Sequence, residues 1–245
     1  MVSQLQQEIW GPTSRPVPPT MLRALGEAGG IVLLGELRGE PVGFAFGFTG
    51  RARDGSAYHR SHAAGLLARA RGRGLGFALK QAQRREALRL GLERMVWTFD
   101  PALAANAHFN LRRLGALARG FQRDYYGARV DALNRQGPSD RLIAEWWLSP
   151  GLERRLREVR RGPGTWVWLP APAELLRPSQ RGRQRLRQQL ESGFSQGLAI
   201  VDFDRERPAY RFAELPPGTP APAEAGGRAQ ASERRSSASA SSSEP

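Results

Sequence analysis

Apolar residues along the chain follow two spacings, one typical of helices and one typical of strands. In the segment 74–90, Leu75, Ala78 and Leu79 share one face of a helix. Two short apolar segments flank the turn 38–40, which predicts a β-hairpin. The expected helices are 2–10, 21–28, 74–90 and 106–115, and the expected strands are 31–37, 42–48, 58–67, 95–99, 121–130 and 141–148.

The pattern changes after Ser149-Pro150, which we take as a domain boundary. The segment 149–215 contains both spacings, but it is small for an independent hydrophobic core. We therefore expect a small α+β extension packed on the domain 1–148, where it extends the sheet, forms an acceptor pocket or builds a dimer. The tail 216–245 is rich in Pro, Ala, Ser and Gly and is expected to be disordered. Within the extension, helices are expected at 151–161 and 179–194, and strands at 165–169, 198–204 and 210–215.

The charge of the chain is one-sided, with 37 basic against 23 acidic residues and a net charge of +14. Lys80 is the only lysine, so arginine supplies nearly all of the excess, which favours anionic partners from phosphate-bearing ligands to nucleic acid. The absence of cysteine excludes disulfides, thiolate metal sites and thiol catalysis. No apolar run is long enough for a membrane span and the first residues lack a signal-peptide pattern, so a cytoplasmic protein of bacterial type is expected.

The segment Arg71-Gly72-Arg73-Gly74-Leu75-Gly76 lies where an expected strand gives way to an expected helix. Backbone N–H groups at a helix start attract anions, and glycines let a phosphate approach the backbone closely. The two arginines can add charge-assisted hydrogen bonds. A tight turn in a glycine-rich chain is the alternative. The spacing fits neither a P-loop, which ends in Lys-Ser or Lys-Thr, nor the Gly-x-Gly-x-x-Gly of dinucleotide-binding folds.

The spacing Arg-x-x-Gly-x-Gly at 71–76 resembles the acyl-CoA signature of the GNAT acyltransferases. Three further segments agree with this family: 66–70 stands at the end of its fourth strand, 95–99 at its fifth strand and 106–115 at its fourth helix. The resemblance extends over residues 31–148 and implies an α+β fold whose central sheet is mixed, mostly antiparallel, splayed and flanked by helices. The family normally opens with a strand that is missing here, so we expect either a lost strand or a true start upstream of Met1.

The resemblance also implies where acyl-CoA binds. In the family, the pantetheine arm bonds to backbone groups between the splayed fourth and fifth strands, here near Leu66 and Leu67. A backbone N–H near Leu67 would polarise the thioester oxygen. Asn106 and Asn110 lie one helical turn apart and could both contact the CoA arm. The alternative is a purely structural role in the helix, which for Asn106 would be that of its N-terminal cap. The expected binding residues for this co-substrate are Leu66, Leu67, Arg71, Gly72, Arg73, Gly74, Gly76, Asn106 and Asn110.

The catalytic groups are less clearly marked. The family's usual proton donor is a tyrosine four residues before the glycine that ends the fourth helix, and Leu111 stands at that position, so this role is reassigned or not needed. His62 is the preferred general base, because it lies on the strand before the loop and an imidazole titrates near neutral pH; a surface or packing histidine is the alternative. Glu145 is the carboxylate alternative, and His59 and His108 are weaker candidates. The histidines show no metal-ligand spacing, so no metal is expected.

These features predict an N-acyltransferase that moves an acyl group, acetyl or another, from CoA to an amine by direct attack in a ternary complex. The acceptor is a small molecule or a protein amine. Two other functions stay open. The missing tyrosine supports a GNAT-like protein that binds CoA without catalysis, and the arginine excess supports a basic nucleic-acid-binding protein, which we disfavour because no known module is present. No membrane partner is expected, and a homodimer is left open.

Overall fold

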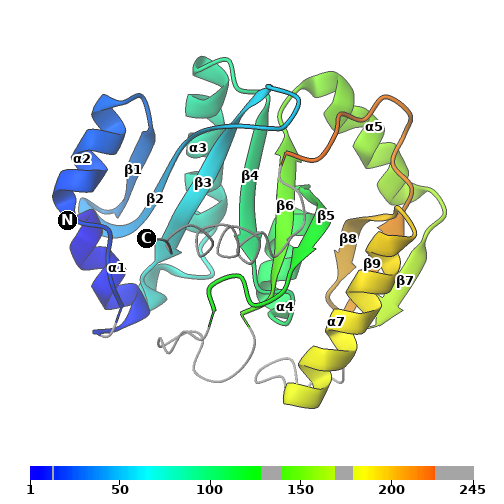
Figure 1. The fold of residues 1–245 in the computed structure, drawn as a ribbon. Coiled ribbons are helices and arrows are strands. Elements are labelled where there is room, and N and C mark those ends of the chain that lie inside the picture. Colours follow the sequence, from blue (N-terminus) through cyan, green and yellow to red (C-terminus); the bar gives the residue numbers. More distant parts are fainter. Residues whose placement is uncertain (13, 128–138, 169–178, 224–245) are drawn as a thin grey trace, which may run out of the picture.

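The computed structural model describes residues 1–12, 14–127, 139–168 and 179–223. Its centre is a nine-stranded sheet in the order β1-β2-β3-β4-β6-β5-β8-β9-β7 (Figure 1). The β3–β4 pair is parallel and the other described pairs are antiparallel, so the expected mixed, mostly antiparallel α+β architecture is confirmed. Across the described residues, no helix combines the length and apolar composition that a membrane span requires. The strands are β1 Ile31–Leu37, β2 Glu40–Arg51, β3 Ala57–Leu66, β4 Arg94–Phe99, β5 Leu117–Gln122, β6 Arg141–Trp147, β7 Thr165–Trp168, β8 Ala199–Asp204 and β9 Ala209–Ala213, and the helices are α1 Val2–Trp10, α2 Pro19–Glu27, η1 Ala68–Ala70, α3 Leu75–Arg89, α4 Ala104–Ala107, the π-helical η2 His108–Arg113, α5 Pro150–Arg161 and α7 Gln180–Ser195.

The two N-terminal helices cover one face of the β1–β2 hairpin, and α3 lies behind the sheet (Figure 1). Leu5 of α1 and Leu22 of α2 are buried in one cluster with Phe44 and Phe46 of β2. Trp10 packs edge-on against Phe44 with their ring centroids 5.4 Å apart. This apolar cluster fixes the hairpin, and β3 continues the sheet from it toward β4.

The parallel pair β3–β4 is short. The two strands are paired at His59–Met95 and Arg60–Val96, although β3 continues to Leu66 and β4 to Phe99. Beyond these pairs β3 stays hydrogen-bonded to β2 and β4 stays hydrogen-bonded to β6, so each strand follows its own neighbour and the two separate (Figure 1). The expected splay is therefore present, and its vertex lies directly after Arg60 and Val96.

The C-terminal extension continues the same sheet. β8 pairs with β5 through Ile200 and Ala118, and β9 and β7 follow as the outer strands. Helix α7 is held to the first part of the chain by the buried Leu190 and by a two-pronged ion pair between Arg183 and Asp100, with N–O distances of 3.1 and 3.2 Å. Of the three roles expected for the extension, the structure contains the sheet extension.

Two expectations need correction. The strand expected at 121–130 is β5, which ends at Gln122; Tyr125 and Tyr126 lie in the following turn and pack on each other, and 128–130 lie outside the described residues. From this turn the two side chains still contact the sheet, since Arg60 of β3 donates to the Tyr125 hydroxyl over 2.9 Å and the Arg141 guanidinium of β6 lies 4.9 Å from the centroid of the Tyr126 ring. The tail was expected to be disordered from Pro216, yet 216–223 lies against the sheet and Ala223 is buried there. The rest of the tail is outside the described residues.

Candidate functional site

The loop between β3 and α3 holds two glycines in the left-handed region. Gly72 has a φ of 76° and Gly74 a φ of 78°, a conformation that a Cβ disfavours. A Cβ at either position would meet no atom within 4 Å, so both glycines face open space. Gly76 has a different role, since a Cβ there would lie 3.4 Å from Leu66 and 3.8 Å from Phe109. It lets the start of α3 pack closely on the end of β3.

Backbone donors converge at the start of α3. Within the described residues, no acceptor is recorded for the N–H groups of 72–77, and Ala78 is the first to bond back, to the carbonyl of Gly74. The first turn of the helix contains no acidic residue that would neutralise its positive end. Such a set of free amides at the start of a 15-residue helix suits a phosphate group.

The two arginines of the loop differ. Arg71 donates from Nε to the carbonyl of Leu66 over 3.2 Å, so its side chain ties the loop to the end of β3. Arg73 is exposed and has no recorded partner in the described part of the chain. Arg73 is therefore the guanidinium free to bind an anion beside the amides.

Backbone groups on one edge of β3 face the gap between the splayed strands. The amide of Leu67 donates to the carbonyl of Val42 over 2.9 Å, which marks a hydrogen-bonded pair with β2. In an antiparallel ladder such pairs alternate with residues whose N–H and C=O point away from the partner strand. Ala64 and Leu66 are those residues here, and their N–H groups point toward the β4 side. The N–H of Leu67 is already used by β2, so the amide near Leu67 that stays available to a ligand is that of Leu66.

The buried face of α3 includes two polar side chains, which the apolar pattern of the sequence did not predict. Its buried residues are Leu79, Lys80, Gln83 and Ala87, whereas Ala78, expected on this face, is exposed. The signal was the i, i+3, i+7 spacing of Lys80, Gln83 and Ala87, together with a single lysine in a chain that otherwise uses arginine.

Lys80 lies at the vertex of the splay. Its Nζ donates to Ser61 Oγ over 2.7 Å and to Gln83 Oε1 over 3.2 Å, and it lies 4.1 Å from the centroid of the Trp97 ring. Ser61 and Trp97 directly follow the paired part of β3 and β4. Burial lowers the pKa of Lys80 from 10.5 to about 7.

His62 occupies a β-bulge next to the same vertex. It is the extra residue between Ser61 and Ala63, which pair with consecutive residues of β2. Its side chain is exposed and lies beside the Phe46 ring, with centroids 5.5 Å apart. Partial burial and, to a smaller extent, the charge of Arg60 lower the pKa of His62. An exposed imidazole that is neutral at pH 7 suits a general base.

The other two histidines are less suited to catalysis. His59 is fully buried, and neither of its ring nitrogens has a hydrogen-bond partner among the described residues. Burial, with a smaller contribution from Lys80, lowers the pKa of His59 to about 3. Burial and the neighbouring Arg205 also lower the pKa of His108, which lies in η2. In the ranges described, no group of three or more His, Asp or Glu side chains could hold a metal ion.

Glu145, the carboxylate considered for catalysis, belongs to a buried ion cluster. Its side chain is 1% exposed and forms a salt bridge with Arg119, and Arg94 lies 4.0 Å away. Its other oxygen accepts from the N–H of Ala223 over 3.0 Å, and Arg94 also donates to the carbonyl of Ala221. Both carboxylate oxygens are thus engaged, so these contacts favour a structural role that ties 216–223 to the sheet.

The two asparagines of the α4–η2 region serve different purposes. Asn110 is buried, and its Oδ1 accepts from Trp97 Nε1 over 3.1 Å, so this side chain fixes the indole. Asn106 is exposed inside α4 and is not its cap, which is Leu103. It remains available to a ligand. Leu111 is fully buried, so the position of the family's tyrosine offers no proton donor.

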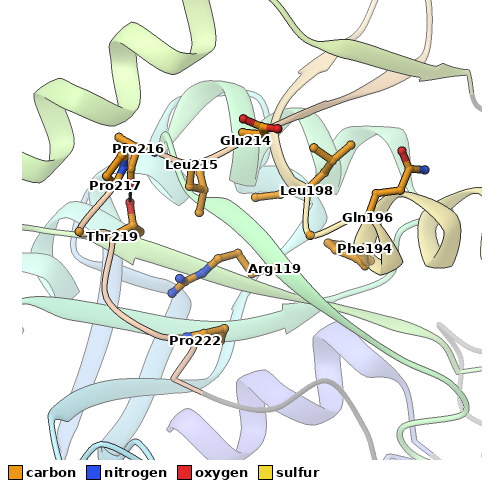
Figure 2. A pocket seen from close by; sticks show the side chains of 13 residues that line it. Arg119, Phe194, Gln196, Leu198, Glu214, Leu215, Pro216, Pro217, Thr219 and Pro222 are labelled. Atoms are coloured by element: carbon orange, nitrogen blue, oxygen red, sulfur yellow. Dashed lines mark hydrogen bonds between the residues drawn. The ribbon is translucent and has the colours of Figure 1, made fainter.

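A pocket of about 660 Å³ lies elsewhere, between the end of α7 and the segment 214–222 (Figure 2). Arg119, Phe194 and Leu198 line it, and the hydroxyl of Thr219 donates to the carbonyl of Pro216 on its rim. None of its lining residues belongs to the loop 71–77 or to the vertex of the splay. This pocket and the free amides are therefore separate features.

The N-terminal part of the chain is similar to one known protein family. Residues 2–116 match the model of the acetyltransferase (GNAT) family. This match agrees with the expected acyltransferase class. The match begins before the expected span of 31–148 and ends at the start of β5. A comparison with curated proteins gave no significant match.

Several solved structures are similar at low sequence identity. YncA of Salmonella typhimurium, an acetyltransferase with its cofactor acetyl-CoA, is 21% identical, covers 61% of this chain and 87% of its own, and gives a TM-score of 0.46. The ribosomal-protein-S18-alanine N-acetyltransferase of Escherichia coli is 16% identical over 60% of this chain and 85% of its own, with a TM-score of 0.45. A GNAT acetyltransferase of Elizabethkingia anophelis with acetyl-CoA bound is 11% identical over 56% and 94%, with a TM-score of 0.43.

Proposed function

We propose that the protein is an N-acyltransferase that transfers an acyl group, acetyl in the first instance, from acyl-CoA to an amine. The observation that carries the proposal is the start of α3, where the N–H groups of 72–77 and the side chain of Arg73 have no partner within the described residues. These donors match the charge of the CoA pyrophosphate. The GNAT family match supports an acyl-CoA as the donor.

The rest of acyl-CoA would follow the free edge of β3. The N–H groups of Ala64 and Leu66 point toward the gap between the splayed strands, where the pantetheine arm would lie. One of them would donate to the thioester oxygen and stabilise the negative charge that develops there during attack. Asn106, exposed on α4, would contact the arm from the other side of the gap.

His62 would act as the general base. Its lowered pKa keeps the imidazole neutral near pH 7, and its exposed position in the bulge gives it access to an incoming amine. The amine nitrogen attacks the thioester carbon after losing its extra proton, the C–S bond breaks and the CoA thiolate leaves. Glu145 has no part in this proposal, because its oxygens are bound by Arg119 and Ala223.

The test compares the same substitution at the two ends of α3. Gly74 and Gly91 both have positive φ, 78° and 71°, and a Cβ at either meets no atom within 4 Å. Gly74→Glu and Gly91→Glu therefore add the same charge and a similar backbone strain, but only the first places a carboxylate beside the free amides. Release of CoA thiol from acetyl-CoA is followed with a mixture of amines, and acetyl-CoA affinity is measured by calorimetry.

We expect the wild-type protein to release CoA from acetyl-CoA. In Gly74→Glu the affinity for acetyl-CoA should decrease by at least about 30-fold, since a misplaced charge in such a site costs about 2 kcal/mol or more of binding free energy. Gly91→Glu should bind and turn over acetyl-CoA nearly as the wild type does. Binding without turnover in the wild type would instead support a silent CoA-binding protein, which the buried Leu111 favours. Equal loss in both variants would refute the assignment of the loop.

A further inference from the structure

The vertex of the splay contains a buried ammonium group that the mechanism above does not use. Lys80 reaches it from α3 and is 6% exposed. Ser61 and Trp97, which contact its Nζ, are the first residues on β3 and β4 after the last parallel pair. The nitrogen thus lies where the two strands begin to separate, on the side of the sheet that α3 covers.

The described residues that contact Lys80 carry no negative charge. In the described part of the chain, no carboxylate forms a hydrogen bond or an ion pair with it. From β3 it faces Ser61 and the neutral His59, from β4 the Trp97 ring, and from its own helix Gln83. A lone buried cation destabilises a fold, so its retention at this position calls for a functional reason.

Resting on the function proposed above, we infer that Lys80 is the proton donor to the departing CoA sulfur. When the amine nitrogen forms its bond to the thioester carbon, the C–S bond breaks, and its electron pair takes a proton from Nζ to give CoA thiol and a neutral lysine. The attacking nitrogen releases one proton as it becomes an amide, and this proton returns Lys80 to its charged form. Atoms and charges balance without a further reactant.

The contacts suit both states of this cycle. The Trp97 ring and the oxygens of Ser61 and Gln83 stabilise the ammonium form, and burial stabilises the neutral form. The pKa of about 7 lies below the value of about 8.5 for a free cysteine thiol, so transfer to a thiolate of similar basicity is favourable. The hydroxyl of Ser61 donates to Gln83 over 2.9 Å, which leaves its oxygen oriented toward Nζ.

A first experiment uses the wild-type protein and needs no activity. Because Lys80 is the only lysine, ¹³C-labelled lysine gives one side-chain ε signal, which is followed between pH 5 and 11. We expect a midpoint near 7, and a midpoint shift when CoA is added. A midpoint near 10, unaffected by CoA, would overturn the inference while leaving the proposed acyl transfer intact.

The second experiment measures catalysis. Lys80→Met keeps the length of the side chain and removes the proton. We expect acetyl-CoA affinity within threefold of the wild type and a kcat that is lower by about 100-fold. The decrease of kcat at alkaline pH should also disappear. Lys80→Gln serves as a second variant if the first is poorly folded. Wild-type turnover with an unchanged kcat and pH profile in a folded variant would refute the role of Lys80. An inactive wild type with the NMR midpoint near 7 would refute the proposed function instead.

Discussion

The ion cluster around Glu145 makes a sharp prediction about stability. Glu145 is 1% exposed, Arg94 is 2% exposed and Arg119 is 11% exposed at their side chains, so all three charges lie largely out of water. Glu145→Gln keeps the size of the side chain and retains an oxygen for the N–H of Ala223. It removes the carboxylate that forms ion pairs with both arginines.

Removing one partner of a buried ion pair costs about 3–5 kcal/mol, because the remaining charge stays buried without compensation. Because the hydrogen bond to Ala223 is retained, we expect Glu145→Gln to lower the free energy of unfolding by about 3 kcal/mol, the lower end of this range. For a chain of this size each kcal/mol lowers the melting temperature by about 2–4 °C, so we expect a decrease of about 6–12 °C. The segment 216–223 should also become more sensitive to proteolysis, since Glu145 and Arg94 hold it.

Thermal unfolding followed by circular dichroism measures this effect. The matched control is Glu86→Gln, which removes an exposed i,i+3 pair with Arg89 at 3.1 Å on α3. Such a surface pair is worth less than about 1 kcal/mol, so the control should stay within about 3 °C of the wild type. A Glu145→Gln protein as stable as its control, with lost turnover, would contradict the structural role and return Glu145 to the catalytic candidates.

Three further predictions concern the loop and the vertex. Arg73→Ala should weaken acetyl-CoA binding by about tenfold through a lost charge-assisted hydrogen bond, whereas the exposed Arg85→Ala on the same helix should not; equal affinities by calorimetry would count against Arg73. His62→Ala should lower kcat about 100-fold and remove the acidic limb of its pH profile, since the lowered pKa keeps the base neutral down to below pH 6.5; an unchanged profile would exclude it. The pKa of Lys80 is about 7 in the folded protein and 10.5 in the unfolded chain, so the unfolded chain takes up this proton first as the pH falls. The free energy of unfolding of the wild type, relative to Lys80→Met, should therefore decrease as the pH falls from 10.5 to 7, by up to about 1.4 kcal/mol per pH unit. Urea unfolding of the wild type and of Lys80→Met at pH 7 and 9.5 measures this change in stability. The same change in unfolding free energy with pH in both proteins would refute the lowered pKa of Lys80.

Features with local signals could be predicted from the sequence. The hairpin β1–β2 and helix α3 lie within a few residues of their expected bounds, because apolar runs, turn residues and glycines act over short distances. The positions of Gly72 and Gly74 were predictable for the same reason, since the spacing of the loop is itself a sequence feature.

The polar centre of the molecule could not be predicted in this way. The burial of Lys80 depends on Ser61 and Trp97, which lie on two different strands, and the environment of Glu145 depends on Arg119 and on residues 221–223 from the far end of the chain. Hydrophobic patterning assigns charged side chains to the surface, so the spacing of Lys80 could suggest its burial but could not identify the partners that surround it.

The position of β5 failed for a related reason. Its sequence, Leu-Ala-Arg-Gly-Phe-Gln, has a weak alternation and includes Gly120, where a Cβ would lie 2.9 Å from Ile143 of β6. The strand is specified by close packing against β6 and by pairing with β8, where Ala118 pairs with Ile200, 82 positions further along the chain. Tyr125 and Tyr126, which have higher strand propensity, pack on each other in the turn instead.

The proposed function requires that backbone amides at the start of α3 bind the pyrophosphate of CoA. The most direct test is a titration of the ¹⁵N-labelled protein with CoA, followed through the amide signals of Gly72, Gly74 and Gly76. We predict large, saturable shifts of these three signals and an unmoved signal for Gly91 at the other end of the helix. Saturable CoA binding that shifts other amides and leaves these three in place would contradict the account.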